Sequence, residues 1–469
     1  IGCTMNTRQL AALKLRRDVK GIGCKVPVLN RRKSRYVYLD NAASTPPLQP
    51  VLNQMDEFWN WYSGVHRGTG YKSLISSKLY DDSHETIARF VGADLERDTV
   101  ILVKNTTDAI NKLSFRLQLQ PQDIVAITAM EHHSNELPWR ARAQVMYIQV
   151  DKDGLLIPDH LEHLFRQYPS RIKLVAACGA SNVTGHINDV HRLARIAHAH
   201  GCPILVDGAQ LIPHRRFDMK PHSYDDHIDF LAFSGHKVFA PFGAGVLIGP
   251  RSAFAAGVPD YQGGGTIKLV TSNRIWWAEP PDKDEAGVPN VGGAFGLAAT
   301  LQHLDRLGMD DLGGYEEDLT DYALEQLRAT RGVKIYGAKP RVGVITFNLA
   351  DLPHALVGAV MCFEAGIGLR TACFCAQGYV RHLLGLTEND VDPALYESNR
   401  LDKIPGMVRI SLAPYNTREE IDFLVKWLKI LNENKYEFRR RYKFSPQFGG
   451  FWPLGLDERS YFNLTGVSL

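Results

Sequence analysis

The sequence has no apolar run close to the roughly 20 residues that a membrane-spanning helix needs, and it shows no apolar core of a secretory signal peptide. It contains no GxxxxGKS or GxxxxGKT motif, which excludes a P-loop site for nucleotides. Neither sign of charge dominates, because 54 Lys and Arg residues face 51 Asp and Glu residues and leave a net charge of +3. We therefore expect no membrane partner and no nucleic-acid partner.

Cysteine is sparse and scattered. Seven cysteines occur in the whole chain, at positions 3, 24, 178, 202, 362, 373 and 375. An odd number of widely spaced cysteines in a long chain is typical of free thiols in a reducing compartment, so we expect a cytoplasmic protein. Cys373 and Cys375 form CxC rather than CxxC, and no second pair of cysteines or histidines has the spacing of zinc ligands. The sequence thus predicts no metal site.

Positive charge is concentrated at the start of the chain. Residues 1–36 hold ten Lys and Arg residues and a single acid, Asp18, which is a net charge of +9. Such a basic segment is typical of a mobile, solvated arm. An organelle-targeting segment is the alternative, because the stretch is rich in arginine and poor in acids.

The length of 469 residues, 45% of them hydrophobic, predicts two domains with large cores. Short apolar runs that are typical of buried strands alternate with amphipathic helices, expected at 107–119 and 190–200. The predicted strands cover residues 99–105, 123–129, 144–150, 172–178, 203–209, 229–235 and 244–249. This alternation indicates an α/β layer with a mostly parallel sheet.

The pattern changes after about residue 300. A long helix at about 315–330, strands at 342–349 and 408–413, and a closing helix at 418–432 predict a smaller α+β domain. We therefore divide the chain into four segments: a basic extension (1–35), a large domain (36–300), a small domain (301–435) and a basic and aromatic tail (436–469).

Polar residues follow several of the predicted strands, where parallel sheets bind their ligands. Thr106 and Thr107 lie where a strand passes into a helix, a place suited to phosphate, although a simple threonine N-cap is the alternative. His132 follows the next strand. Asp207 ends a buried strand and needs a cationic or hydrogen-bonding partner. Lys237 follows another strand in "LAFSGHK", where a solvated surface lysine is the ordinary explanation.

Pyridoxal phosphate explains these residues together, because it needs an amine for a Schiff base, an anion at its ring nitrogen, an aromatic partner and donors for its phosphate. We expect Lys237 to supply the amine and Asp207 to pair with the ring nitrogen. The other expected cofactor-binding residues are Gln210 at the ring oxygen, His132 stacked on the ring, and Thr106, Thr107, Ser234 and His236 at the phosphate.

The chain resembles the class V family of pyridoxal phosphate enzymes and, within it, the cysteine desulfurases of the Suf type. The resemblance covers about residues 36–432 in family order. The stretches that carry it are "YLDNAASTPP", "VHRGTG", "KNTTDAIN", "MEHHSNELPW", "SNVTGHIND", "VDGAQ", "FSGHK", "GGGTI", "PNVGG", "LRTACFCAQ" and "VRISLAPYNTREEID". It implies a fold of the aspartate-aminotransferase type, with a PLP-binding large domain, and a homodimer with active sites at the subunit interface.

The resemblance also implies an activity: L-cysteine is converted to L-alanine, and Cys375 becomes a persulfide that is passed to a protein sulfur acceptor. Lys237 and His132 match residues that move protons. The residues that match the substrate side are Asn182, Arg409 for the carboxylate, Arg370, and His66 from the partner subunit. Positive surroundings from Arg370 and His132 are expected to favour the thiolate of Cys375.

The sequence departs from the family pattern around the expected nucleophile. The Suf-type loop reads Arg-x-Gly-His-His-Cys, whereas residues 370–375 read Arg-Thr-Ala-Cys-Phe-Cys, so both histidines are missing and a second thiol is present. Val291 stands where the family has a threonine for the partner subunit's phosphate. The alternatives are a lyase that acts on cysteine or selenocysteine by β-elimination, a class V aminotransferase or epimerase without sulfur chemistry, and a non-catalytic scaffold. In these readings Cys375 is an inert thiol.

Overall fold

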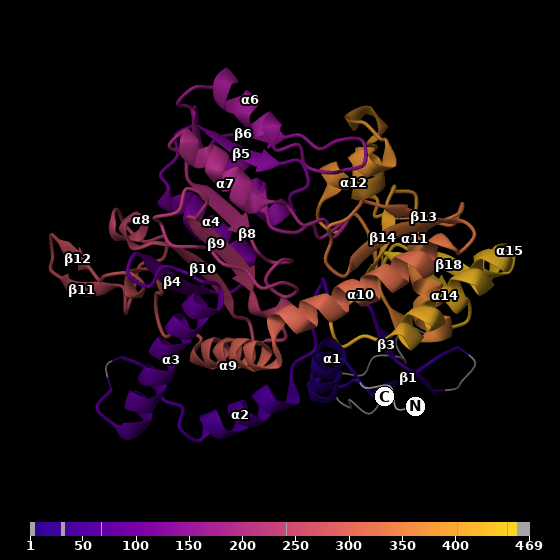
Figure 1. Cartoon of the computed structure of the whole chain (residues 1–469), viewed down its shortest axis with the longest axis horizontal. Helices are drawn as coiled ribbons and strands as arrows, with labels where there is room; N and C mark the ends of the chain where they lie inside the picture. The colour runs from indigo at the N-terminus through magenta and orange to yellow at the C-terminus, as the bar shows by residue number, and fades with distance from the viewer. Residues whose placement is uncertain are drawn as a thin grey trace.

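The computed structural model describes residues 5–29, 33–66, 68–240, 242–400, 402–447 and 449–456. The chain forms two lobes, each built on its own sheet, and the long helix α10 (Met309–Arg328) runs from the larger lobe into the smaller one (Figure 1). Among the described helices, none combines the length and the apolar character needed to cross a bilayer.

The larger lobe contains a seven-stranded sheet in the order β4-β10-β9-β8-β7-β5-β6. Only β10 runs antiparallel to its neighbours, so the expected mostly parallel α/β sheet is confirmed, and its strands are the seven predicted from the sequence. The strands are β4 (Asp98–Val103), β5 (Ile124–Thr128), β6 (Gln144–Ile148), β7 (Ile172–Cys178), β8 (Ile204–Asp207), β9 (Phe230–Ser234) and β10 (Gly245–Pro250).

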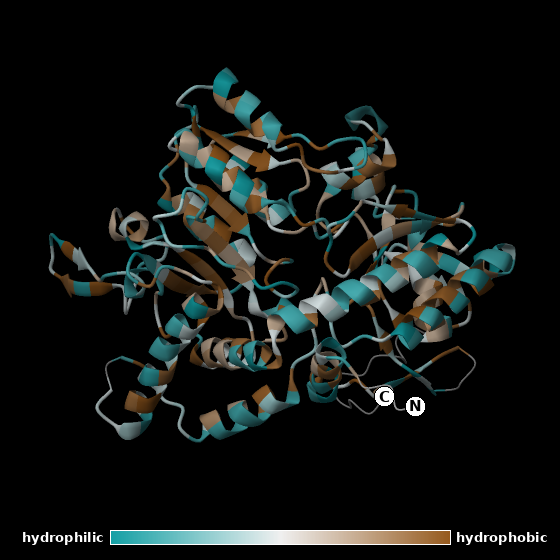
Figure 2. Cartoon of the chain, viewed as in Figure 1, coloured by the Kyte–Doolittle hydropathy of each residue, from teal (hydrophilic) through white to brown (hydrophobic). Residues whose placement is uncertain are grey.

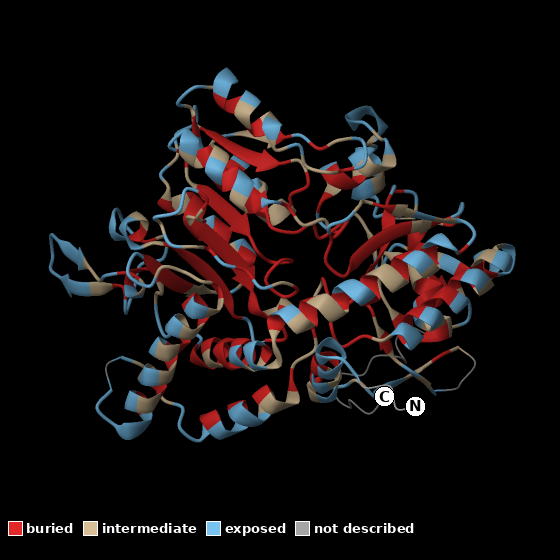
Figure 3. Ribbon diagram, in the orientation of Figure 1, coloured by how far each residue is buried: buried red, intermediate tan, exposed pale blue. Residues whose placement is uncertain are grey.

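Both faces of this sheet are covered, because successive residues of a strand point to opposite sides. In β5, Ile124 and Ala126 belong to one apolar core, and Val125 and Ile127 belong to another. Figures 2 and 3 show the result: the strands are apolar and buried, whereas the helices expose one polar side. Helices that contribute buried residues to the first core include α2 (Gln49–Trp59), α3 (Tyr71–Phe90), α6 (Asp159–Gln167), α7 (Val190–Ala199) and α9 (Val291–Leu307). The second core receives buried residues from α4 (Thr106–Arg116), α5 (Leu137–Arg140) and α8 (Arg251–Ala255).

The smaller lobe contains a four-stranded antiparallel sheet in the order β13-β14-β17-β16. Apolar side chains from this sheet and from its helices form a separate core. The elements are β13 (Val333–Tyr336), β14 (Val344–Leu349), β16 (Arg370–Ala372), β17 (Met407–Ser411), α11 (His354–Val360) and α14 (Arg418–Glu433). Smaller elements are β1 (Lys25–Pro27), β2 (Lys33–Arg35), β3 (Val37–Tyr38), β11 (Ile267–Val270), β12 (Ile275–Trp277), β15 (Ile367–Gly368), α12 (Gln377–Leu384) and α13 (Pro393–Glu397).

The long helix begins earlier than the expected residue 315. The sequence does not indicate this start, because the adjacent Gly313 and Gly314 are unfavourable in the interior of a helix. Gly313 packs close to the backbone of His214, where an added Cβ would lie 3.1 Å from the carbonyl oxygen. Tertiary packing therefore overrides the local preference.

The basic segment at the start of the chain is a packed helix, so the expectation of a mobile arm is wrong for its described residues. Helix α1 (Thr7–Asp18) begins at the N-cap Asn6 and packs against α10. Leu15 is fully buried, and Arg16 forms an ion pair with the buried Glu420 at 2.7 Å. The segment therefore belongs to the fold.

The predicted tail also packs, as far as residue 456. Its described part consists of one helix and a hairpin, α15 (Lys435–Arg441), β18 (Tyr442–Ser445) and β19 (Gly450–Pro453). Trp452 lies edge-on against Phe363 of the smaller lobe, with ring centroids 4.9 Å apart. Residues 457–469 lie outside the described residues. The division of the chain at 35, 300 and 435 stays a prediction, and β3 pairs with β15 of the smaller lobe.

We expect Leu15→Ala to destabilise the protein by about 2–5 kcal/mol, because it leaves a cavity where α1 meets the body. Leu10→Ala on the same helix is the matched control, since Leu10 is 42% exposed and should change stability by less than about 0.5 kcal/mol. Urea unfolding of the two variants measures the difference. Equal effects would show that α1 is not docked.

Candidate active site

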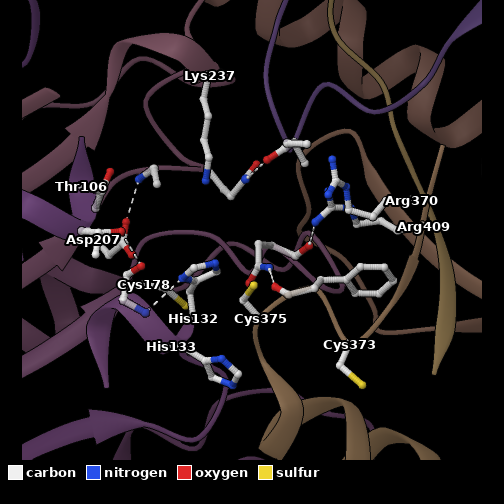
Figure 4. A pocket seen from close by; sticks show the side chains of 18 of the residues that line it. Thr106, His132, His133, Cys178, Asp207, Lys237, Arg370, Cys373, Cys375 and Arg409 are labelled. Carbon is white, nitrogen blue, oxygen red and sulfur yellow. Dashed lines mark hydrogen bonds between the residues drawn. The ribbon is translucent and has the colours of Figure 1, made fainter. Parts of the chain in front are cut away.

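A cavity of about 650 Å³ lies between the two lobes. On the side of the larger lobe, its lining includes the last residues of three parallel strands, namely Cys178 of β7, Asp207 of β8 and Ser234 of β9. On the side of the smaller lobe, its lining comes from β16, β17 and the loop before α12. Both sheets thus contribute polar side chains to one space (Figure 4).

Asp207 and Lys237 form the charged centre of the larger lobe's contribution. Asp207 is buried, and burial raises the pKa of its carboxyl, although a hydrogen bond from the Ala209 N–H and the charge of Lys237 lower it. Burial also lowers the pKa of the Lys237 ammonium, with Arg409 acting in the same direction and Asp207 in the opposite one. A lysine with a lowered pKa is more often a free amine, which is the form that attacks a carbonyl group.

His132 lies in the same cavity and is a neutral hydrogen-bond donor. Its Nδ1 accepts the Ser134 N–H at 3.1 Å, so its proton sits on Nε2. Burial lowers the pKa of His132 to about 3, helped by the charges of Lys237, His133 and Arg409. The expectation that His132 adds positive charge beside Cys375 is therefore wrong. The ring is free to stack on a planar ligand and to donate a proton from Nε2.

The first turn of α4 faces the cavity with its hydroxyl groups. The helix is capped by Asn105, whose side chain accepts the Asp108 N–H at 3.0 Å, so a threonine N-cap is excluded. Thr106 bonds to the Ser234 hydroxyl through its N–H at 2.8 Å and its Oγ1 at 2.6 Å, and Thr107 bonds to a neighbouring serine hydroxyl. These groups and the half-buried His236 form a cluster of donors at a helix N-terminus, which suits an anion.

Gln210 reaches the cavity with its amide. Its Nε2 donates to the Ala42 carbonyl at 2.7 Å, and its buried Oε1 has no hydrogen-bond partner within the described part of the chain. A buried amide oxygen without a partner is costly. The position therefore suits a ligand with a donor group.

Two arginines of the smaller lobe meet on one carboxylate. Arg370 and Arg409 lie opposite each other in the β16–β17 pair. Both bond to Asp40, Arg370 through Nε at 3.0 Å and Nη2 at 2.8 Å, and Arg409 through Nη2 at 3.2 Å. Arg409 is buried, burial lowers its pKa to about 10, and its Nε has no partner among the described residues. Its cationic group thus points into the cavity with unused bonding capacity.

The loop that carries the thiols is held in a strained conformation. Ala372, Phe374 and Cys375 all have positive φ angles of 93°, 52° and 55°, which non-glycine residues rarely adopt. Asn182 donates from Nδ2 to the Phe374 carbonyl at 2.7 Å, and the His133 N–H donates to the Cys375 carbonyl at 2.7 Å. These bonds hold the thiol of Cys375 in place.

The two thiols of this loop have different surroundings. Cys375 is exposed and lies among the cations, since the charge of its thiolate raises the pKa of Lys237, Arg370 and Arg409. Cys373 is less exposed, donates to the Pro405 carbonyl at 3.4 Å and has a pKa raised by burial. In Figure 4 the Cys373 side chain points away from Lys237. Cys375 is the thiol that the cavity surrounds with positive charge.

Asn182 and Arg409 are brought together as predicted, since Arg409 Nη1 donates to the Asn182 carbonyl at 2.9 Å. The bond uses the backbone of Asn182, whose side chain holds the thiol loop instead. His66 does not line this cavity in its own chain. It lies beside a smaller one with Gly264 and Glu285, and its Nε2 is 3.1 Å from Asp81.

Sequence reasoning missed two carboxylates. Asp40, in the quoted stretch "YLDNAASTPP", lies two residues after the short strand β3, and a polar residue placed just after a strand is a signal that could have revealed it. Glu131 is buried beside His132 and accepts the Thr128 hydroxyl and the Cys178 N–H. Burial raises the pKa of Glu131 to about 8, although these bonds lower it. Glu131 fixes the loop between β5 and the histidine.

The residues present fit pyridoxal phosphate. The cavity offers a lysine of lowered pKa, a buried aspartate without an ion pair among the described residues, a neutral histidine ring and a donor cluster at a helix N-terminus. The unpartnered Gln210 Oε1 lies among them. Each of these groups has a counterpart on the cofactor: its carbonyl carbon, ring nitrogen, ring face, phosphate and ring oxygen.

Comparisons with known proteins agree with this site. A probable cysteine desulfurase of Halalkalibacterium halodurans is 35% identical over 419 residues, covering 87% of this chain and 96% of that protein. A cysteine desulfurase of Serratia proteamaculans is 36% identical over 403 residues, covering 84% and 92%. Solved structures of a cysteine desulfurase from Thermococcus onnurineus, in its apo form, and of CsdA from Escherichia coli match with TM-scores of 0.76 and 0.75. They are 30% and 28% identical in sequence; each match covers 92% of this chain, and 100% and 99% of the respective structures.

Residues 37–424 match the family model described as aminotransferase class-V, which spans both lobes and the whole cavity. With relatives above 30% identity over most of its length, the chain belongs to the class-V aminotransferase family.

Proposed function

We propose that this chain is a pyridoxal phosphate-dependent cysteine desulfurase that converts L-cysteine to L-alanine and carries the sulfur as a persulfide on Cys375. The observation that carries the proposal is the position of that thiol. Cys375 is exposed, held by a strained loop, and faces the cations Lys237, Arg370 and Arg409. An inert thiol needs none of these features.

The cofactor would be held by Lys237, Asp207, Gln210 and the donor cluster of α4, with His132 against its ring. Pyridoxal phosphate, when bound, withdraws electrons from the substrate's carbon and so makes its sulfur substituent easier to remove. The lowered pKa of Lys237 favours the free amine that binding requires.

The smaller lobe would bind and orient the amino acid. Arg409 offers its guanidinium to the substrate's carboxylate, as two parallel N–H···O bonds suit that planar group. Asp40 and the Asn182 carbonyl hold Arg409 in this orientation.

Cys375 would receive the sulfur. Its thiolate forms a bond from Sγ to the substrate's sulfur while the carbon–sulfur bond breaks, and the electron pair of that bond stays with the carbon. Lys237 Nζ returns to the carbon side a proton that its amine has accepted from the substrate, while His132 Nε2 donates a hydrogen bond, and alanine results. The exposed persulfide would then pass its sulfur to a protein acceptor.

We propose a homodimer in which His66 reaches the partner subunit's cavity. Support comes from the position of His66 outside its own cavity and from the exposed rings of Trp59 and Tyr71 nearby, which are 50% and 84% exposed. We propose a cytoplasmic location, supported by the six described cysteines, all of which are free. The packing of α1 into the fold counts against a removable targeting segment.

The products of L-cysteine distinguish the proposal from a lyase. The pure protein loaded with pyridoxal phosphate should release alanine in a one-to-one ratio with sulfur transferred to a reductant, because sulfur leaves toward a thiol. Chromatography of the amino and keto acids measures both products. Pyruvate as the main product would show β-elimination and contradict the proposal.

Replacing each of the two thiols should affect activity differently. We expect Cys375→Ser to lower alanine formation by at least about a hundredfold and to remove the persulfide, because the acceptor of sulfur is lost. Cys373→Ser is the matched control and should keep most activity, since the Cys373 thiol has a raised pKa and bonds to Pro405. Alkylation of trapped persulfide followed by peptide mass measurement locates the sulfur. A persulfide on Cys373 in the unaltered protein would contradict this assignment.

Arg409→Lys should raise the KM for L-cysteine at least about tenfold, because an ammonium group cannot make the two parallel bonds of a guanidinium. Cysteamine, which lacks the carboxylate, is the control substrate, and its slower turnover should not change by the same factor. Cofactor absorbance and the melting temperature show whether the buried site has kept its fold. An equal loss for both substrates would assign Arg409 a structural role instead.

A further inference from the structure

A second cluster of chemically active side chains lies on the other edge of the central sheet. His198 is in the last turn of α7, and His227 and Asp229 come just before β9. Strand β9 carries its Ser234 end to the catalytic cavity, so Asp229, which precedes the strand, lies about 17 Å from Ser234 at about 3.3 Å per residue. The cluster is thus separate from the proposed active site.

Both histidines turn the same nitrogen toward the same carboxylate. His198 Nε2 lies 2.8 Å from Asp229 Oδ2, and His227 Nε2 lies 3.3 Å from Asp229 Oδ1. The three ligand atoms all lie within 4.8 Å of one another. The two rings are stacked with centroids 4.3 Å apart, and the three side chains are only 13–17% exposed.

The other nitrogen of each ring fixes its protonation. His198 Nδ1 lies 2.7 Å from the Asp225 carbonyl, and His227 Nδ1 lies 2.6 Å from the Tyr224 carbonyl. A carbonyl only accepts hydrogen bonds, so each Nδ1 must carry the proton. In a neutral imidazole the Nε2 then has a bare lone pair, and two such lone pairs face the carboxylate of Asp229.

The Nε2 lone pairs and the oxygens of Asp229 are all hydrogen-bond acceptors. They repel one another unless a positively charged group lies between them. A single imidazolium at His198 would supply it for Oδ2 and leave the His227 Nε2 lone pair facing Oδ1, and two stacked imidazolium rings would repel each other. A divalent cation supplies it without that cost, and metal-bound histidines commonly donate their other N–H to a backbone carbonyl, as both do here.

The distances fit Zn²⁺. Ligand atoms about 2.0–2.1 Å from a tetrahedral Zn²⁺ lie about 3.3–3.4 Å from one another. The separation of His227 Nε2 and Asp229 Oδ1 already has this value. The three ligand atoms lie within 4.8 Å of one another, so the remaining separations need to close by at most about 1.4 Å. Asp229 is anchored by the Ile204 N–H at 2.9 Å, so the carboxylate is fixed at the start of β8.

We propose that His198, His227 and Asp229 bind one Zn²⁺, with water in the fourth position, and that this site ties α7 to the starts of β8 and β9. The sequence predicted no metal site because these ligands come from two separate segments and none is a cysteine. The proposal does not depend on the function proposed for the other edge of the sheet.

Titration of the full-length protein, loaded with pyridoxal phosphate and first freed of metal by a chelator, with Zn²⁺ alone tests it. We expect one equivalent to bind and to raise the melting temperature. His198→Gln and His227→Gln should each weaken this binding at least about tenfold and abolish the rise. His200→Gln is the matched control, because His200 also ends α7 and pairs with a carboxylate, Glu162, but has no second histidine beside it.

Co²⁺ in place of Zn²⁺ gives a second readout that does not depend on the stability of the variants. Difference spectra of the unaltered protein should show the visible bands of four-coordinate Co²⁺ ligated by nitrogen and oxygen. Thiolate charge-transfer bands, or Zn²⁺ binding that both histidine variants retain, would place the metal on the cysteines and overturn the proposal. Absence of stoichiometric binding would also overturn it and leave protonated histidines as the positive centre.

Discussion

The cavity between the lobes depends on the carboxylate of Asp40. This residue follows β3 at the start of the chain, yet it accepts hydrogen bonds from Arg370 and Arg409 on two neighbouring strands of the smaller lobe. Without it, two guanidinium groups that lie opposite each other in the β16–β17 pair would face one another unpaired in a partly buried place. Removing one partner of such a buried arrangement costs more than the arrangement itself contributes. Asp40 therefore holds the two cations of the cavity in place and so determines the side from which an anionic group can enter.

The thiol loop is the second constraint, and it is built on strain. Three residues between Ala372 and Cys375 adopt positive φ angles, each of which costs on the order of 1 kcal/mol or more. Bonds from Asn182 and from the His133 N–H hold the loop in that conformation, and Phe374 packs under Arg409 with its ring 4.9 Å away. A relaxed loop would let Cys375 move away from the cations. The strain is thus the cost of holding the thiol in a fixed position.

The sequence predicted the larger lobe well because its signals are local. Each apolar run bounded by turn residues, such as the one that ends at Asp207, is a strand of the sheet, and several of these strands bring polar residues at or just beyond their carboxyl ends to the cavity. The interactions between distant segments could not be read in the same way. Nothing local to "YLDNAAS" indicates that Asp40 meets Arg409, some 370 residues further on. The basic composition of α1 likewise concealed Leu15, since one buried leucine among charged neighbours leaves no periodic pattern.

The protonation states of the histidines also could not be predicted from the sequence. Histidine beside a cysteine suggests a cation, and the sequence predicted one at His132. Burial among Lys237 and Arg409 instead keeps that ring neutral, with its single proton fixed on Nε2 by the bond that Nδ1 accepts. The same reasoning applied to His198 and His227 gives a different arrangement, because there the backbone carbonyls fix a proton on Nδ1 and turn each Nε2 toward a carboxylate. Backbone groups that no sequence pattern encodes thus decide whether a histidine in this protein can donate a proton or bind a cation.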